Sequence, residues 1–350
     1  MAIVALRKLA TEQRDVMQKS LGLLCALTLG MAAASATAQT QAPEPKQEAP
    51  DRTLDPAQFT HAQFAHMDVS HGKPFVMVTI NGQGPFRFVI DTGTGGQAFI
   101  SSTLAKQLGL TQVGRMRLSD PTGKGSRIAP MVLIPSLQVA GVEFNGIKAA
   151  VHDLDDSDGQ CQGLLGFLLF RNYLLTLDYP NRQMHLSIGE LVPDGEHSII
   201  PFRMPDGIPL IPLHIGSTTI EAQLDSGGAG LSLPEEFALH MSFASDPVSF
   251  SNAYSITTRF QIKGGKLGSD VHLGDYTFQQ PFIEINPAFP LANFGACPMQ
   301  NFAITFDQKH TLVRFEAAHQ VLHLTATPAP MHLNNASKDL LPDPTLVPVG

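Results

Sequence analysis

Two short triplets, each opening with an acidic residue, are the part of this sequence best suited to do chemistry. Asp91 opens an Asp-Thr-Gly triplet and Asp225 opens an Asp-Ser-Gly triplet. Each triplet follows an apolar run typical of a strand, so each carboxylate is expected on a tight turn at the end of a strand. Gly93 and Gly227 would let a second backbone approach these turns closely. If a local two-fold axis relates the turns, the two carboxylates meet.

Two carboxylates held close together share one proton, because two like charges at that separation cannot both persist at modest pH. One member of the pair Asp91 and Asp225 would then act as a general base on a bound water. The other would act as a general acid toward a carbonyl oxygen. This chemistry requires no metal and no cofactor.

Three hydroxyl side chains next to the aspartates are candidates to support them. A buried hydroxyl at Thr92 and another at Ser226 can each hydrogen-bond across to the opposite turn and lock the two turns together. Thr94 can donate a hydrogen bond to the outer oxygen of its carboxylate, whereas Gly228 at the matching position has no side chain. The two aspartates are therefore expected to differ in pKa.

An internal repeat favours a paired role for the triplets. A single triplet of this type most often marks only a turn. Here the two aspartates lie 134 residues apart, and two later pairs of landmarks, Gly166 with Gly295 and Asp178 with Asp307, recur at an offset of 129. Three landmarks in constant order at a nearly constant offset are hard to obtain by chance. The sequence therefore predicts a duplicated lobe.

The elements that must position the triplets are predicted to be mostly strands. Short apolar runs alternate with Gly and Pro turns, and a β-hairpin can be read upstream of each triplet. Long amphipathic helices are scarce. Short helices are predicted over residues 102–108 and 234–240, each beginning about ten residues after its triplet.

These residues resemble the retropepsin-like and pepsin-like aspartic protease superfamily, in particular its bacterial exported members with both lobes in one chain. The resemblance covers about residues 71–316, and it rests on the triplets together with the apolar-Gly segments 163–166 and 293–295. It implies an all-β fold of two similar acid-protease-type β-barrel lobes with a central cleft and a few short helices. It also implies a site composed of catalytic Asp91 and Asp225, supported by Thr92, Gly93, Thr94, Ser226 and Gly227.

The resemblance further implies a peptide or protein substrate lying extended in the cleft beneath flexible hairpins. The first candidate hairpin spans residues 116–128, with Gly123 and Gly125 near its tip, and the second spans about residues 253–267. Pepsins carry a substrate-orienting tyrosine in the first hairpin, where this sequence has none. Tyr254, in the second hairpin, is the candidate replacement.

Two other functions are compatible with the same residues. One is a catalytically silent peptide-binding or scaffold protein of this fold, and the other is a protease that cleaves only itself. Because one chain supplies both aspartates, a monomer is sufficient for the site.

The amino terminus predicts export. Basic residues precede the apolar run 21–29, and small residues follow it up to Ala38, which is the order of a signal peptide. The run is too short to span a bilayer permanently, so a periplasmic or secreted protein without a stable membrane span is expected. The predicted divisions are a signal peptide (1–38), a linker or pro-segment (39–70), an N-terminal lobe (71–192), a C-terminal lobe (193–316) and a tail (317–350).

Composition and the remaining motifs exclude several function classes. The formal net charge is −8 and the basic residues are scattered, so no nucleic-acid partner is expected. Three histidines, His61, His66 and His71, recur at a spacing that does not place them on one side of a strand or helix, so no metal site is predicted.

Cys161 and Cys297 could pair in an oxidising compartment or remain buried thiols, and the sequence leaves both open.

Overall fold

The structure is a computed structural model, and its described residues are 62–70, 72–119, 122, 125–153, 161–254 and 259–325. The predicted signal peptide, most of the predicted linker and the end of the predicted tail lie outside these residues. Within the described part of the chain, no helix is long and apolar enough to cross a membrane.

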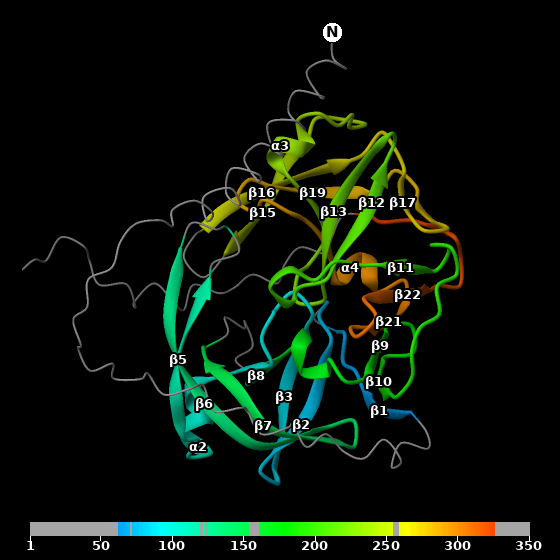
Figure 1. The fold of residues 1–350 in the computed structure, drawn as a ribbon. Helices are drawn as coiled ribbons and strands as arrows, with labels where there is room; N and C mark the ends of the chain where they lie inside the picture. The colour runs from blue at the N-terminus through cyan, green and yellow to red at the C-terminus, as the bar shows by residue number, and fades with distance from the viewer. Residues whose placement is uncertain are drawn as a thin grey trace, which may run out of the picture. The chain divides into compact units, whose positions relative to one another are not determined.

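Strands dominate the part of the chain that carries the first triplet (Figure 1). These strands are β1 (Gln63–His66), β2 (Phe75–Ile80), β3 (Gln83–Asp91), β4 (Ala98–Ile100), β5 (Gln112–Ser119), β6 (Ser126–Val139), β7 (Val142–Val151), β8 (Gly163–Gly166), β9 (Leu174–Asp178) and β10 (Gln183–Ser187). The helical segments here are α2 (Ser102–Gln107) and the 3-10 turn η2 (Phe167–Phe170).

The part that carries the second triplet is built in the same way. Its strands are β11 (Ile199–Pro201), β12 (Leu210–Ile215), β13 (Thr218–Asp225), β14 (Leu231–Pro234), β15 (Val248–Tyr254), β16 (Arg259–Lys266), β17 (Val271–Leu273), β18 (Tyr276–Phe278), β19 (Phe282–Asn286), β20 (Ala292–Gly295), β21 (Ala303–Asp307), β22 (Leu312–Glu316) and β23 (Val321–Leu322). Its helical segments are η3 (Pro205–Gly207), α3 (Glu235–Ala238) and α4 (Ala296–Met299).

The two predicted short helices are confirmed in place, and both are shorter than expected. In α2, the Ser101 hydroxyl caps the helix by accepting from the Leu104 amide at 3.2 Å. Gly109 ends the segment with a φ of 59°, in the left-handed region that glycine favours. The other helix, α3, is a single turn that follows Pro234.

The strands form three sheets. A seven-stranded sheet has the order β2-β3-β8-β4-β7-β6-β5 and curls back on itself, because β2 also pairs with β6. A ten-stranded sheet in the second lobe has the order β15-β16-β19-β14-β20-β13-β12-β17-β18-β23. A six-stranded sheet, β1-β10-β9-β21-β22-β11, takes strands from both lobes. The predicted all-β, two-lobed fold is confirmed.

Equivalent strand pairings confirm the duplication. In the first lobe β3 runs parallel to β8 with Asp91 opposite Gly166, and in the second β13 runs parallel to β20 with Asp225 opposite Gly295. Beyond these pairs, β4 lies between β8 and β7 just as β14 lies between β20 and β19. The landmarks matched in the sequence are therefore matched in the sheets.

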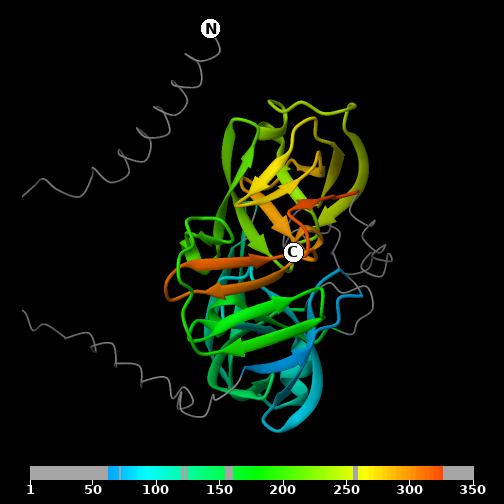
Figure 2. The ribbon, with the colours of Figure 1, turned by 90° about the vertical axis from the view of Figure 1, so that its right-hand side faces the viewer.

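The six-stranded sheet joins the lobes through its two central strands. Figure 2 shows β9 and β10 in green beside β21 and β22 in orange. The strands β9 and β21 are antiparallel, and Thr176 stands opposite Thr305 with their hydroxyl oxygens 2.9 Å apart. Residues from both halves of the repeat thus share one continuous hydrogen-bonded layer.

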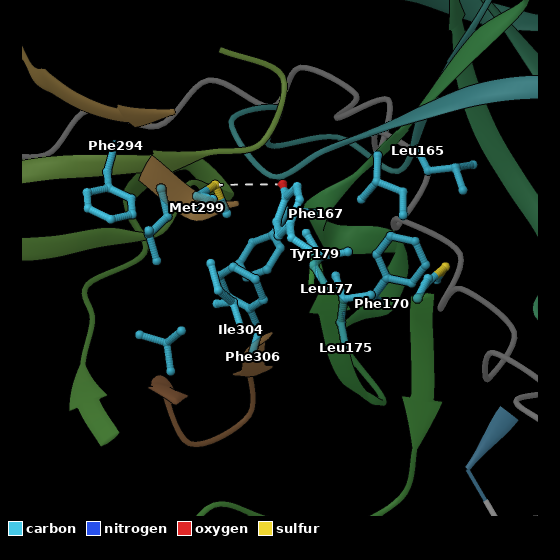
Figure 3. Close-up of a cluster of buried hydrophobic side chains, with 14 of the residues drawn as sticks. Leu165, Phe167, Phe170, Leu175, Leu177, Tyr179, Phe294, Met299, Ile304 and Phe306 are labelled. Atoms are coloured by element: carbon cyan, nitrogen blue, oxygen red, sulfur yellow. Dashed lines mark hydrogen bonds between the residues drawn. The ribbon is translucent and has the colours of Figure 1, made fainter. Parts of the chain in front are cut away.

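A shared core of large apolar side chains backs this layer. Phe167 of the first lobe meets Phe306 of the second edge-on, with ring centroids 5.2 Å apart, and both rings are fully buried. Removing such a ring from water stabilises the fold by about 1.5–3 kcal/mol. Figure 3 labels the cluster: Leu165, Phe167, Phe170, Leu175, Leu177, Tyr179, Phe294, Met299, Ile304 and Phe306.

The folded body extends beyond both predicted boundaries. It begins before residue 71, because β1 pairs with β10 and the side chain of Met67 is fully buried. It continues past residue 316, because β23 pairs with β18 and Leu322 is buried. Both strands are short and lie at sheet edges, so neither carries a periodic pattern long enough to be recognised in the sequence.

Candidate active site

Each aspartate is the last residue of a strand and begins a turn that passes beneath an apolar-Gly segment. After Asp91, the chain is held against η2 by hydrogen bonds from the Gly166 amide to the Gln97 carbonyl (2.9 Å) and from the Phe167 amide to the Thr94 carbonyl (3.0 Å). In the second lobe, the Gly295 amide likewise donates to the Gly230 carbonyl at 3.0 Å. A side chain at Gly166 or Gly295 would collide with the backbone of its turn. The glycines in these segments therefore allow the turns to lie against them.

The two turns face each other at close range. A Cβ atom added to Gly93 would lie 2.5 Å from Cγ of Asp225, and one added to Gly227 would lie 2.5 Å from Cγ of Asp91. Neither position can accept any side chain without moving the opposite carboxylate. The glycine of each triplet thus makes room for the aspartate of the other.

Four hydrogen bonds lock the turns together in a reciprocal pattern. The Thr92 hydroxyl donates to the Leu224 carbonyl at 2.7 Å and accepts from the Ser226 amide at 3.0 Å. The Ser226 hydroxyl donates to the Ile90 carbonyl at 2.7 Å and accepts from the Thr92 amide at 3.0 Å. Thr92 and Ser226 are both fully buried, so each bond is shielded from water.

The surroundings of the two carboxylates differ. Thr94 donates through its hydroxyl to Oδ2 of Asp91 at 3.1 Å, while Oδ1 of Asp91 is buried and has no hydrogen-bond partner. Oδ1 of Asp225 accepts two backbone bonds, from Gly227 at 2.9 Å and from Gly228 at 2.8 Å. The backbone at Gly228 therefore supplies a hydrogen bond to Asp225 where the first turn uses the Thr94 hydroxyl.

These surroundings shift the pKa of each carboxyl group. Burial, followed by the negative charge of Asp225, raises the pKa of Asp91 to about 7. Burial also raises the pKa of Asp225, but the positive charge of Lys73 and the two backbone donors lower it again. The arrangement favours a protonated Asp91 beside an ionised Asp225.

One further residue influences the pair and was not identified from the sequence. The positive charge of the exposed Lys73 lowers the pKa of both aspartates. The next residue, Pro74, accepts a hydrogen bond from the Ile90 amide at 2.9 Å, which sets Lys73 beside the end of β3. Tyr179 is buried, and this burial, followed by the negative charge of Asp225, raises the pKa of its hydroxyl. In the hairpin β2–β3, Phe75 stands opposite Val89. Continuing this register by two residues brings Lys73 opposite Asp91, and in this way the sequence could have identified Lys73.

The two candidate flaps are hairpins visible in Figure 1. Strands β5 and β6 form the first, but Gly123 lies outside the described residues and Gly125 lies just before β6. Strands β15 and β16 form the second, which begins at Val248, earlier than the predicted residue 253. Tyr254 ends β15, and its side chain is outside the described part of the structure.

The cysteines do not form a bridge. The structure has no disulfide between Cys161 and Cys297, which answers the question that the sequence left open. The Cys161 thiol donates to the Gly163 carbonyl at 3.2 Å, and burial raises the pKa of the Cys297 thiol. Of the three histidines considered from the sequence, only His66 lies within the described residues, in β1.

Comparison with known proteins adds one finding. A family model described as aspartyl protease matches residues 76–168, which run from β2 into η2 and include the first triplet and β8. A comparison with curated proteins gave no match. The second triplet lies outside the matched residues, so its pairing with the first rests on the geometry described above.

Proposed function

We propose that this chain is an aspartic endopeptidase that uses Asp91 and Asp225 as a catalytic pair, and the match of residues 76–168 to the aspartyl protease family model supports this proposal. The observation that carries this proposal is the reciprocal hydrogen bonding of Thr92 and Ser226, which holds two partly buried carboxylates from the two lobes face to face. An ordinary turn has no need for such a lock or for a raised carboxyl pKa.

In the first step, a water molecule bound between the carboxyl groups attacks the carbonyl carbon of the scissile peptide bond. The ionised carboxylate of Asp225 accepts a proton from this water as the new carbon–oxygen bond forms. The Asp91 carboxyl donates its proton to the carbonyl oxygen, and the product is a neutral tetrahedral diol. The charge therefore moves from Asp225 to Asp91, and no ion develops on the substrate.

In the second step, the tetrahedral intermediate collapses. The proton held by Asp225 passes to the departing amide nitrogen as the carbon–nitrogen bond breaks, and one hydroxyl of the diol returns its proton to Asp91. The products are a carboxylic acid and an amine, and both aspartates regain their starting states. The chain's own residues supply every proton transfer in this scheme.

The same geometry supports a substrate bound in an extended form. The hairpins β5–β6 and β15–β16 are candidates to cover it, with Gly125 in the first and Tyr254 in the second. Since one chain supplies both aspartates, we propose that a monomer is sufficient for catalysis.

Peptide cleavage tests this function directly. The purified chain would be incubated with a diverse peptide library from pH 3 to pH 8, and the products would be identified by mass spectrometry. We expect internal cleavage that is inhibited by a peptide in which a secondary alcohol replaces the scissile carbonyl, because such an alcohol resembles the diol. An intact library at every pH would refute the proposal and favour a peptide-binding protein, and a mass change confined to the chain's own amino terminus would favour self-cleavage alone.

We also propose that residues 1–38 direct export. The support is the order of basic, apolar and small residues, since this segment lies outside the described part of the chain. Amino-terminal sequencing of protein recovered from the exported fraction of the producing cells should begin at Gln39. An amino terminus before residue 21 on that protein would contradict the proposal.

A further inference from the structure

Four polar side chains form a row across four neighbouring strands of the second lobe. Thr219 of β13 stands opposite His214 of β12, His214 stands opposite His272 of β17, and His272 stands opposite Thr277 of β18. Figure 1 shows β13, β12 and β17 next to one another in this order. Two histidines thus stand side by side on adjacent strands, with a threonine on each outer flank.

The alternation of side chains along the strands exposes this row. The residues on either side of the histidines, including Leu213, Ile215 and Leu273, point into the core and are buried. His214 is exposed and His272 is partly exposed. Directly opposite residues on antiparallel strands have Cβ atoms about 4.5–5.5 Å apart, so the two imidazoles are within reach of one bound ion.

Each threonine orients the imidazole beside it. The Nδ1 atom of His214 lies 2.8 Å from the Thr219 hydroxyl, and the Nδ1 atom of His272 lies 3.0 Å from the Thr277 hydroxyl. Both Nδ1 atoms therefore face outward, away from the neighbouring histidine. Because Nδ1 and Nε2 are separate atoms of the imidazole ring, the Nε2 atom of each histidine is not the one that contacts the threonine.

When Nδ1–H donates to the threonine hydroxyl, Nε2 keeps its lone pair free. Histidines that bind metals are usually held in this way, with the second ring nitrogen donating to a neighbouring oxygen. A shallow hollow adjoins the row, and it is lined by Glu196, Pro212, His214 and Gly274 among others. Glu196 lines the same hollow as His214, and its negative charge favours a cation over an anion.

We propose that His214 and His272 form a two-histidine binding site for a divalent transition-metal ion such as Zn²⁺ or Cu²⁺. Imidazole nitrogen suits these ions. Among the described residues no group of three or more His, Cys, Asp or Glu side chains is arranged to hold a metal. The site therefore supplies two protein ligands, and water completes the coordination. The bound ion would cross-link β12 to β17, independently of the aspartate pair.

Metal titration of the full exported chain, produced without a polyhistidine tag, tests the site. Isothermal titration with Zn²⁺ should show one saturable site in the parent. Replacing either ligand, in His214→Ala or His272→Ala, should abolish it, and Thr219→Val should weaken it about tenfold, because the imidazole loses its orienting partner. His240→Ala, which removes an exposed histidine elsewhere, is the matched control and should bind Zn²⁺ as the parent does.

Two readouts that do not depend on enzymatic activity complete the test. Electron paramagnetic resonance of bound Cu²⁺ should report two nitrogen ligands in the parent. Zn²⁺ should raise the melting temperature of the parent and of His240→Ala, but not of His214→Ala, because only a folded chain presents both ligands. Melting of each variant without metal shows whether it is folded. Absence of saturable binding in the parent, or unchanged binding in both ligand variants, would overturn the proposal.

Discussion

At the scale of single residues, two chemically identical carboxyl groups have been given different environments. Asp91 has one oxygen without a hydrogen-bond donor, whereas Asp225 receives two backbone donors on one oxygen. A buried carboxylate oxygen without a donor is costly when ionised, so protonation is the favoured remedy at Asp91. The proposed division into general acid and general base rests on these few contacts.

The raised pKa of Asp91 predicts a specific pH dependence of stability. A carboxyl group whose pKa is raised by folding contributes its stabilisation fully below its unfolded pKa, and this contribution is lost as the pH rises toward the folded value of about 7. Asp91→Asn cannot ionise. We therefore expect the free energy of unfolding of this variant to increase relative to that of the parent, by roughly 1–4 kcal/mol, as the pH rises from 4 to 7. Urea denaturation at both pH values measures the difference, and a gap that does not change with pH would contradict the assignment.

A second prediction concerns Thr94. Its hydrogen bond lowers the pKa of Asp91, so Thr94→Val should raise that pKa further. The proposed mechanism requires a protonated Asp91, so we expect the alkaline limb of the kcat/KM profile to move to higher pH. Thr94→Ser keeps the hydroxyl and is the matched control. An unchanged alkaline limb in the valine variant would show that Thr94 does not act on the titrating group.

At the scale of elements, the strand ends β3 and β13 are held together by side chains rather than by strand pairing. The hydroxyl groups of Thr92 and Ser226 each accept one hydrogen bond from the opposite segment and donate one to it. Thr92→Val keeps the shape but leaves the Ser226 amide and the Leu224 carbonyl unpaired in a buried place. We expect a loss of about 2–4 kcal/mol in free energy of unfolding, as two buried partners lose their bonds.

Thr92→Ser provides the control for that prediction, because it retains the hydroxyl and removes only a methyl group. Its stability should fall by about 1 kcal/mol or less. Chemical denaturation of the two variants beside the parent decides the matter. Equal losses in both would mean that packing, and not the hydrogen bonds, holds the turns together.

Local patterns in the sequence predicted the elements that carry the site. The hairpins, the triplets and the apolar-Gly segments are visible because each has turn residues and apolar runs within a short stretch. The edge strands β1 and β23 are not visible in the sequence, because strands of four and two residues are too short to show a periodic pattern. The pairing of His214 with His272 was also hidden, because contacts between distant strands are set by sheet register rather than by spacing in the chain.

At the scale of the whole molecule, the repeat predicted two lobes but did not predict the layer that they share. The six-stranded sheet draws strands from both lobes, and Phe167 and Phe306 pack against each other across the division between them. This arrangement ties the stability of one lobe to that of the other. The relative position of the two aspartates depends on the same layer.

Phe306→Ala tests that coupling. The change removes a fully buried ring, and we expect a loss of about 3–5 kcal/mol in free energy of unfolding. The loss should appear as a shift of a single calorimetric transition, because the shared layer unfolds as one unit. Leu239→Ala, at a residue that is 77% exposed, should change the stability by less than about 0.5 kcal/mol. Two transitions, of which only one moves, would show that the lobes unfold separately.

The central claim is that Asp91 and Asp225 together activate the attacking water, and isosteric substitution of each aspartate tests it most directly. Initial cleavage rates of one identified peptide substrate would be measured at the optimum pH for the parent, Asp91→Asn, Asp225→Asn and the control Thr92→Ser. We predict that either asparagine variant loses activity by at least about 1,000-fold while staying folded, because each removes the shared proton chemistry, and that the control keeps most of its activity. Cleavage by both asparagine variants at the rate of the parent would show that the two aspartates are structural turns and that the peptide bond is broken elsewhere.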